Sequence, residues 1–237
     1  MNSLLNQASQ LFSDFTALLF PNLCMACMED APVRNDFFCM RCSYKLPRTD
    51  FHLHKENPFT ARLWGRIPIE TAAAMFLLIK GGLAENVIYN IKYKDATQLA
   101  QKLGREYGWV LKKSPLYNSV DLVVPVPLHK SKMKTRGYNQ SAFFAAGIAE
   151  SLEVPCIEHA LVKVRKSVSQ TKKSRLQRLL SVENEYKVNI PESMQGKHVL
   201  LVDDVLTTGA TIESCALEIF KLEDTKVSLG TIAFKNH

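Results

Sequence analysis

The chain has 237 residues, of which 46% are hydrophobic and 22% are charged, so its composition excludes a disordered or collagen-like protein and fits one well-buried domain with a small additional unit. The formal net charge of +7 favours anionic partners such as phosphates, nucleic acid or a membrane surface, without choosing among them. No apolar run reaches the length of a membrane span, and the first residues lack the features of a secretory signal, so we expect a cytoplasmic protein whose cysteines are reduced or metal-bound.

Apolar residues recur at roughly helical spacing in residues 1–20, which predicts an amphipathic helix that is stopped by Pro21. The segment contains few basic residues, so we interpret the helix as one that packs against the rest of the protein. A role at a membrane surface is the alternative, although helices that bind there usually carry a polar face rich in Lys and Arg.

Residues 21–50 contain two Cys-x-x-Cys pairs, with eleven residues between them. Each pair can close one knuckle, and two knuckles supply the four thiolate ligands of a tetrahedral zinc site. Because four protein ligands leave no open position, the predicted Zn²⁺ is structural. A pair of redox disulfides is the alternative. The predicted ligands are Cys24, Cys27, Cys39 and Cys42.

Four further residues could bind metal but lack the spacing of a site. His52 and His54 follow the second pair and are expected on the surface, although either could replace a lost cysteine ligand. Cys156 and Cys215 have no partner at a suitable spacing, and we expect both to be buried small hydrophobic residues.

Residues 51–237 are expected to form the main domain. The segment 47–70 has no clear periodicity and is predicted to be a connector. Apolar runs typical of buried strands in a parallel sheet are expected within 71–80, 122–127 and 161–164, and from residue 199. Helices are predicted over 84–93, 98–111 and 141–152, and from residue 212 onward.

A basic turn follows the predicted strand over 122–127. Residues 130–136 contain four basic side chains and no acid, and a polyanion such as pyrophosphate is a natural ligand for such a cluster. The alternative is a solvated basic surface turn. The turn closes on the element Arg-Gly-Tyr-Asn-Gln at residues 136–140.

Residues 161–178 form a second basic segment, without any acid. A run this basic usually belongs to a solvated, mobile segment. It could also follow a nucleic-acid backbone, because affinity there comes mainly from Lys and Arg that neutralise phosphates. Both interpretations stay open, and they can coexist. The segment contains Lys163, Arg165, Lys166, Gln170, Lys172, Lys173, Arg175 and Arg178.

The most informative stretch is 199–211, where an apolar run ends in Asp203 and Asp204. In open α/β sheets, ligands bind beyond the carboxyl ends of the strands, where these acids are expected. The loop that follows offers backbone N–H groups and three hydroxyls at a helix N-terminus, which favours anions. The alternative is a turn whose Asp and Thr residues only cap the helix. The loop residues are Thr207, Thr208, Gly209, Ala210 and Thr211.

This stretch resembles the phosphoribosyl pyrophosphate (PRPP) signature of type I phosphoribosyltransferases. From about residue 18 onward, the cysteine pairs, Val-Pro-Val-Pro, Lys-Thr-Arg-Gly-Tyr-Asn-Gln, the basic segment and the Asp-Asp loop occur in an order that resembles the ComF/GntX-type family. Tyr138 is a departure, since most members have Phe there. The resemblance implies a type I phosphoribosyltransferase-like parallel sheet flanked by helices, with a small N-terminal zinc-knuckle subdomain built on the four cysteines.

The resemblance also implies roles for individual residues. Asp203 and Asp204 would hold the ribose hydroxyls of PRPP and help to organise Mg²⁺, and the loop 207–211 would bind the 5′-phosphate. The basic segment 161–178 would close over the site, and the zinc knuckle would form the hood that binds the acceptor. The loop that grips pyrophosphate would contain Val126, Pro127, Leu128 and His129, with Arg136 nearby.

What the family implies is a role in natural transformation or in the use of external DNA. Three molecular hypotheses remain. The first is a Mg²⁺-dependent phosphoribosyltransferase, the second is a non-catalytic protein that binds single-stranded DNA, and the third is a PRPP-sensing regulator, because fold alone does not decide function. A DNA-translocating helicase that docks on the N-terminal helix is a further partner hypothesis.

Overall fold

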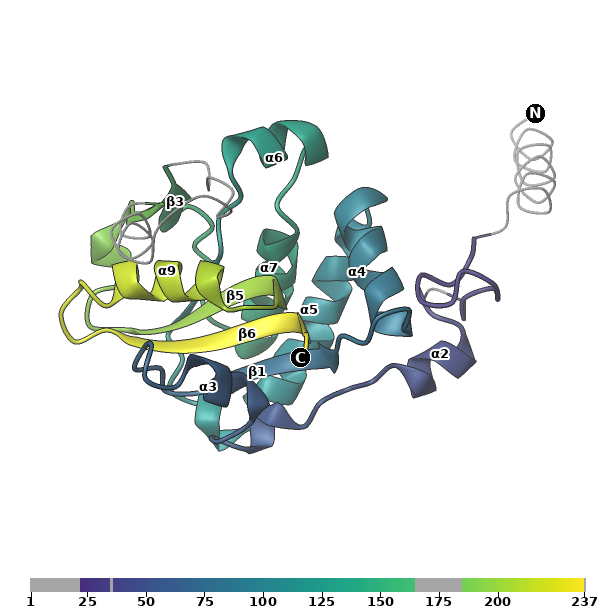
Figure 1. The fold of residues 1–237 in the computed structure, drawn as a ribbon, viewed down its shortest axis with the longest axis horizontal. Coiled ribbons are helices and arrows are strands. Elements are labelled where there is room, and N and C mark those ends of the chain that lie inside the picture. The colour runs from purple at the N-terminus through teal and green to yellow at the C-terminus, as the bar shows by residue number, and fades with distance from the viewer. Residues whose placement is uncertain (1–21, 35, 165–184, 237) are drawn as a thin grey trace, which may run out of the picture.

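The computed structural model describes residues 22–34, 36–164 and 185–236 (Figure 1). The predicted helix over residues 1–20 lies outside these ranges. No helix within them is long and apolar enough to cross a bilayer. Most of the predicted basic segment also lies outside the described residues, namely Arg165, Lys166, Gln170, Lys172, Lys173, Arg175 and Arg178.

The core is a four-stranded sheet in the order β1–β6–β5–β2, and each pair of neighbouring strands is parallel. Nearly all residues of these strands are buried, because helices cover both faces of a parallel sheet. The prediction of a parallel sheet flanked by helices is confirmed. The strands are β1 (Ala72–Leu77), β2 (Leu122–Pro125), β5 (His198–Leu206) and β6 (Lys226–Phe234).

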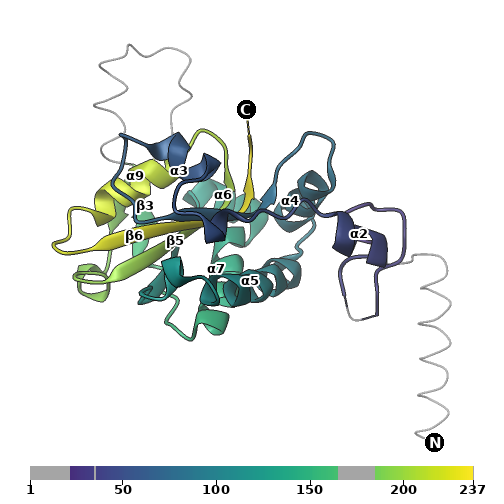
Figure 2. The ribbon, with the colours of Figure 1, turned by 90° about the horizontal axis from the view of Figure 1, so that it is seen from below.

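Helices enclose the sheet from two sides. Figure 2 shows α5 and α7 on one face and α9 and α3 on the other. Glycines let α5 and α7 approach closely, since a Cβ at Gly104 would lie 2.2 Å from the carbonyl oxygen of Phe144. The predicted helices over 84–93, 98–111 and 141–152 are confirmed to within one residue at each end. The helices are α3 (Pro58–Leu63), α4 (Leu83–Tyr93), α5 (Thr97–Lys112), α7 (Gln140–Leu152) and α9 (Ala210–Ile219), with short 3₁₀ turns at Phe51–Leu53, Pro115–Tyr117 and Pro191–Ser193.

The prediction of a strand of the main sheet over 161–164 is wrong. β3 (Leu161–Lys163) pairs antiparallel with β4 (Tyr186–Val188) in a separate two-stranded ribbon. Residues 155–157 pair with the edge of β2 instead, through an isolated parallel bridge at Val123. The proline at the start of this segment has no N–H group with which to extend the pairing.

The predicted connector over 47–70 contains the helix α3. Asn57 caps it by accepting hydrogen bonds from the N–H groups of Phe59 and Thr60, while the Thr60 hydroxyl accepts from the Asn57 N–H. Pro58 occupies the first helical position, where its missing N–H is harmless. The Asn-Pro-x-Thr pattern is a helix-start signal. Apolar periodicity could not show it, because the helix has only six residues.

The basic turn is also helical. α6 (Lys130–Arg136) is capped by His129, whose Nδ1 accepts a hydrogen bond from the Ser131 N–H at 3.1 Å. Gly137 ends the helix with a φ of 80°, in the left-handed region that favours glycine. Apolar periodicity did not predict α6, because this exposed helix has no apolar stripe.

The cysteine-rich segment packs beside α4 and includes the short helix α2 (Met40–Lys45). The side-chain amide of Asn86 donates to the carbonyl of Ala26 at 2.7 Å, and that of Asn90 donates to Met25 at 2.9 Å. Two asparagines one turn apart on α4 therefore attach this segment to the main body.

Candidate ligand-binding site

A cleft of about 620 Å³ lies at the carboxyl ends of β2 and β5. This is the edge at which open α/β sheets bind ligands. The described chain brings together residues predicted from three distant segments. They are Val126, Pro127, Leu128, His129, Arg136, Lys163, Asp203, Asp204, Thr207 and Thr211.

The acid pair lies inside β5 rather than beyond its end. The strand continues to Leu206 because Val205 and Leu206 pair with Ala233 and Phe234 of β6. The predicted strand end before the acids is therefore too early. The two carboxylates still face the cleft, since both contribute to its lining.

Asp203 is held by two donors. Its Oδ1 accepts hydrogen bonds from Ser141 Oγ at 3.0 Å and from the Asp204 N–H at 2.8 Å. Burial at the base of the cleft, followed by the neighbouring Asp204 carboxylate, raises the pKa of Asp203 from 3.8 to about 7. Asp203 is thus an acid that holds a proton in the free protein up to near-neutral pH.

Asp204 has its own counter-ion. Lys92 Nζ of α4 lies 3.0 Å from Asp204 Oδ2, and Gln140 Nε2 of α7 donates to the same oxygen at 2.9 Å. The sequence prediction missed both residues as members of the site. Gln140 could have been found as the last residue of the Arg-Gly-Tyr-Asn-Gln element, whereas no pattern marked Lys92.

The raised pKa of Asp203 leads to a prediction about stability. Between pH 3.8 and about 7, the folded state holds a proton on Asp203 that the unfolded chain has lost. The stabilisation from this group is therefore fully present at low pH and is lost as the pH rises through 7. Asp203→Asn removes the charge and keeps an oxygen that can accept both hydrogen bonds. We expect the variant to melt a few degrees above the wild type at pH 8, and by a smaller margin at pH 5.

Thermal unfolding of both proteins at the two pH values measures this difference. A variant that melts below the wild type at pH 8 would contradict the assigned cost of burying the Asp203 carboxylate.

The loop after β5 leaves room for an anion. A small cavity of about 30 Å³ lies inside it, lined by Asp203 and residues 205–212. Thr207, Thr208 and Thr211 are exposed there, and α9 begins at residue 210, two residues earlier than predicted. The loop and the first turn of α9 can thus present hydroxyls and backbone N–H groups to a phosphate.

Gly209 shapes this loop. Its φ is 83°, and a Cβ there would lie 2.8 Å from the Leu63 side chain. Only glycine accommodates both the left-handed backbone and the close contact with α3.

Two arginines of the α3 region hold the loop from behind. Arg62 Nη1 donates to the carbonyl of Thr207 at 2.7 Å, and Arg66 Nη1 donates to that of Thr208 at 3.0 Å. Arg66 is fixed in turn by an ion pair with Glu213 of α9. Because the arginines occupy these carbonyls, the loop conformation is set before a ligand arrives. The sequence prediction missed both residues, since they lie in the supposed connector.

Basic side chains also line the cleft. Arg136 lies over the ring of Tyr93 at 5.2 Å, and Lys163 Nζ is 2.8 Å from the Tyr186 hydroxyl. Lys132 also lines the cleft. Positive groups thus line the same cleft as the acids, as an anionic ligand with hydroxyl groups would require.

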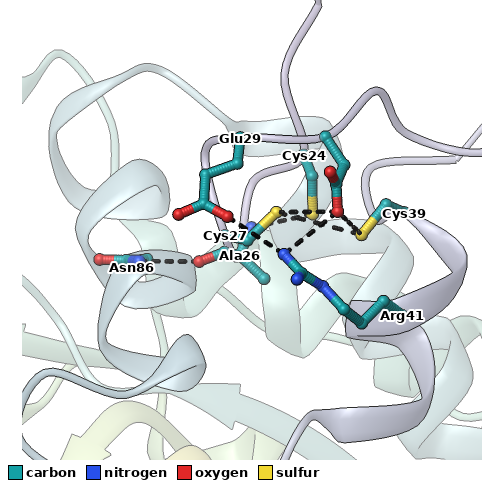
Figure 3. A network of polar contacts seen from close by, with 8 residues as sticks. Cys24, Ala26, Cys27, Glu29, Cys39, Arg41 and Asn86 are labelled. Carbon is teal, nitrogen blue, oxygen red and sulfur yellow. Dashed lines mark hydrogen bonds and ion pairs between the residues drawn. The ribbon is translucent and has the colours of Figure 1, made fainter.

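The four predicted cysteine ligands form a compact cluster, and their sulfur atoms all lie within 4.8 Å of one another. Cys27 Sγ and Cys39 Sγ are 4.0 Å apart, close to the spacing that a tetrahedron with bonds of about 2.3 Å gives. Figure 3 shows Cys24, Cys27 and Cys39 of this cluster with Arg41, which pairs with Glu29 at 3.1 Å. The cluster could therefore hold a metal ion such as zinc.

The two remaining cysteines and the two histidines that were considered as ligands are not part of this cluster. Cys215 is buried as predicted, whereas Cys156 is only half-buried. His54 is exposed and His52 is half-buried. The expected surface position is therefore confirmed for His54 but not for His52. No residue of the cysteine-rich segment, among those described, lines the cleft, so the predicted hood is not formed by residues 22–34 or 36–45. Helices α4 and α6 flank the opening instead.

Comparison with protein families matches residues 139–237 to the phosphoribosyl transferase domain. Three curated relatives are named for competence or DNA utilization. The chain is 20% identical over 219 residues to competence protein F of Haemophilus influenzae, covering 89% of this chain and 96% of that protein. It is 27% identical over 133 residues to DNA utilization protein YhgH of Salmonella typhimurium, covering 55% of this chain and 58% of the relative.

The chain is also 36% identical over 96 residues to competence protein ComFC of Bacillus subtilis, covering 40% of this chain and 36% of that protein. Among solved structures, the allosteric regulatory enzyme of purine biosynthesis is 21% identical over 56% of this chain and 26% of its own, with a TM-score of 0.40. The alignments thus span little more than half of the Salmonella relative and nearly all of the Haemophilus one.

Proposed function

Because the chain is a ComF-type, phosphoribosyltransferase-like protein, we propose that its cleft binds PRPP together with Mg²⁺ and that the protein acts in DNA uptake or in the use of external DNA. The observation that carries the proposal is that the acid pair shares one cleft with residues of the loop after β5 and with basic residues of α6. Residues from the loop after β2 and from α6, α7 and β5 contribute to this arrangement.

The parts of PRPP match the parts of the cleft. The 5′-phosphate fits the loop 207–211, whose carbonyls are already bound from behind and whose N-terminal helical turn favours negative charge. The ribose hydroxyls fit Asp203 and Asp204. The pyrophosphate fits the wall formed by His129, Ser131, Lys132 and Arg136.

The acid pair also fits Mg²⁺, because carboxylate oxygens are the ligands that this ion prefers. When bound, the ion would neutralise charge on the pyrophosphate. In phosphoribosyl transfer, positive charge develops on the ribose as the leaving group departs. Asp203 and Asp204 would then orient the ribose and stabilise that charge, while the basic wall holds the departing pyrophosphate.

Calorimetric titration of PRPP with Mg²⁺ into the protein tests this proposal. We expect saturable binding with one site per chain. Release of pyrophosphate in the presence of a panel of acceptors then separates a transferase from a PRPP-sensing protein, the third hypothesis. Absence of PRPP binding would contradict the proposed ligand.

The two arginines behind the loop lead to a further prediction. In Arg62→Ala and Arg66→Ala, the Thr207 and Thr208 carbonyls lose charge-assisted hydrogen bonds, so ordering the loop is left to the ligand. We expect PRPP affinity to fall about tenfold in each variant. The matched control is Arg48→Ala. Arg48 covers the Phe76 ring as Arg62 covers that of Phe234, but it pairs with Glu106 away from the cleft. Equal affinities in all three variants would show that the loop needs no support.

The cysteine cluster is proposed to bind one structural Zn²⁺. Its sulfur spacing fits that ion, and four protein ligands leave no position for a substrate. The docking of residues 25 and 26 on α4 makes its role one of holding the N-terminal segment to the main body.

Binding of single-stranded DNA is a second candidate function, favoured by the net charge of +7 and by relatives named for competence and DNA utilization. Both functions can belong to one protein, since one protein can bind two anionic ligands at neighbouring basic sites. A gel-shift titration at low salt, where phosphate contacts are strongest, tests for this binding. The proposed helicase partner and cytoplasmic location stay predictions from the sequence.

A further inference from the structure

A second groove, of about 460 Å³, lies beside the cleft. Its walls are the end of α4 and the helix α6, which are neighbours at the upper edge of the molecule in Figure 1. The two hollows share part of their lining, so the groove opens toward the proposed PRPP site. The shared residues are Lys92, Ser131, Lys132 and Arg136.

Two exposed aromatic rings lie at this groove, since Tyr93 lines it and Tyr89 contacts the Tyr93 ring. Tyr89 and Tyr93 lie one turn apart on α4, with 49% and 61% of their surfaces exposed and ring centroids 5.1 Å apart. Two rings in contact form a continuous exposed aromatic surface, and its burial by a ligand would be favourable. Arg136 over the Tyr93 ring adds a cationic edge to this aromatic surface.

Charge around the groove is mostly positive. Its lining includes Lys92, Lys132 and Arg136 against one acid, Asp95. Lys132 has no acidic partner within 4.0 Å among the described residues, unlike Lys92, which is paired with Asp204. A polyanion could therefore bind to the positive charge of Lys132, next to the exposed aromatic faces.

The floor of the groove is fixed. The Tyr138 hydroxyl donates a hydrogen bond to the carbonyl of Ile91 at 2.6 Å, which ties the end of α6 to α4. Tyr138 is the residue at which the chain departs from the Phe of the resembling family, and a phenyl ring could not make this bond. The walls of the groove are thus held together independently of any ligand.

We infer that this groove binds single-stranded nucleic acid. The bases would stack on Tyr89 and Tyr93, and the basic residues of the lining, Lys132 foremost, would hold the backbone phosphates. Stacking platforms beside basic grooves are the usual design of proteins that bind single strands. Acidic peptides would use the charges but not the aromatic faces, and a duplex hides its base faces inside the helix. The inference locates the second candidate function proposed above and does not depend on PRPP binding.

Fluorescence anisotropy with labelled oligonucleotides of about 15 nucleotides, measured on the full chain at low salt, tests the inference. We expect Tyr89→Ala and Tyr93→Ala each to weaken binding about tenfold, and the double variant to weaken it further. Tyr89→Phe and Tyr93→Phe should bind like the wild type, because stacking needs the ring and not the hydroxyl. The corresponding duplex should bind more weakly than the single strand.

The matched control is Trp109→Ala. Trp109 is also an exposed aromatic residue on a helix, with Lys112 over its ring at 5.4 Å, but it lies on α5 away from the groove. It should leave DNA affinity unchanged. A wild type that does not bind single strands, tyrosine variants that bind like the wild type, or a duplex bound equally well would each overturn the inference.

PRPP titration of the same variants keeps the two proposals apart. Tyr89→Ala should bind PRPP as the wild type does, because Tyr89 does not line the cleft. Loss of PRPP binding in every protein, with oligonucleotide binding intact, would reject the PRPP proposal alone.

Discussion

Replacement of Asp203 and Asp204 together by asparagine is expected to weaken binding of PRPP with Mg²⁺ at least about a hundredfold, which would make it undetectable by calorimetry. The double variant keeps the size of both side chains. It removes the negative charge that would hold Mg²⁺ and leaves Lys92 in the cleft without its carboxylate partner. An amide oxygen carries no net negative charge, so it is a weaker ligand of Mg²⁺ than a carboxylate.

Asp36→Asn is the matched control for this experiment. Asp36 also forms a close carboxylate–lysine pair, with Lys102 at 2.9 Å, but it lies in the cysteine-rich segment away from the cleft. PRPP affinity should be unchanged in this variant. Retained PRPP binding in the Asp203/Asp204 variant would show that the acid pair is not the ribose and metal site.

The second large effect is expected from removal of metal from the cysteine cluster. The purified protein should contain one zinc ion per chain, and Cys24→Ser/Cys27→Ser should contain none. Within residues 22–34 and 36–45, few large side chains besides Phe38 are buried, so without metal this segment has little to hold it folded. We expect the melting temperature to fall by several degrees and the segment to become sensitive to proteolysis.

PRPP binding should change by less than about threefold in the same variant, because the described part of the segment does not line the cleft. Cys156→Ser controls for the loss of a thiol outside the cluster. Metal-free wild-type protein with four oxidised cluster cysteines would instead support the redox alternative.

The sequence predicted the acid pair, the anion loop and the cysteine cluster because each depends on residues close together in the chain. Asp203 and Thr211 are eight positions apart, and residue type and spacing alone indicate their chemistry. The longer helices were equally accessible, since α5 carries an apolar stripe over sixteen residues.

The missed features depend on contacts between distant segments. Lys92 enters the site only because α4 packs next to the carboxyl end of β5, and Arg62 reaches Thr207 across 145 positions of sequence. The strand β3 was assigned to the wrong sheet for a similar reason, since three apolar-rich residues do not specify which strand they pair with. Capping patterns would have revealed α3, but no local signal revealed what its arginines contact.

The strand order has a consequence for how the protein is made. β1 pairs only with β6 in the main sheet, although more than 140 residues separate them in the chain. Arg62 also binds the carbonyl of Lys235, immediately after β6. During synthesis, β1 and α3 therefore emerge from the ribosome long before their partners exist. The support of the loop 207–211 is completed only when β6 inserts between β1 and β5. A nascent chain that stops short of β6 therefore carries the whole Asp-Asp signature without the geometry of the proposed binding site.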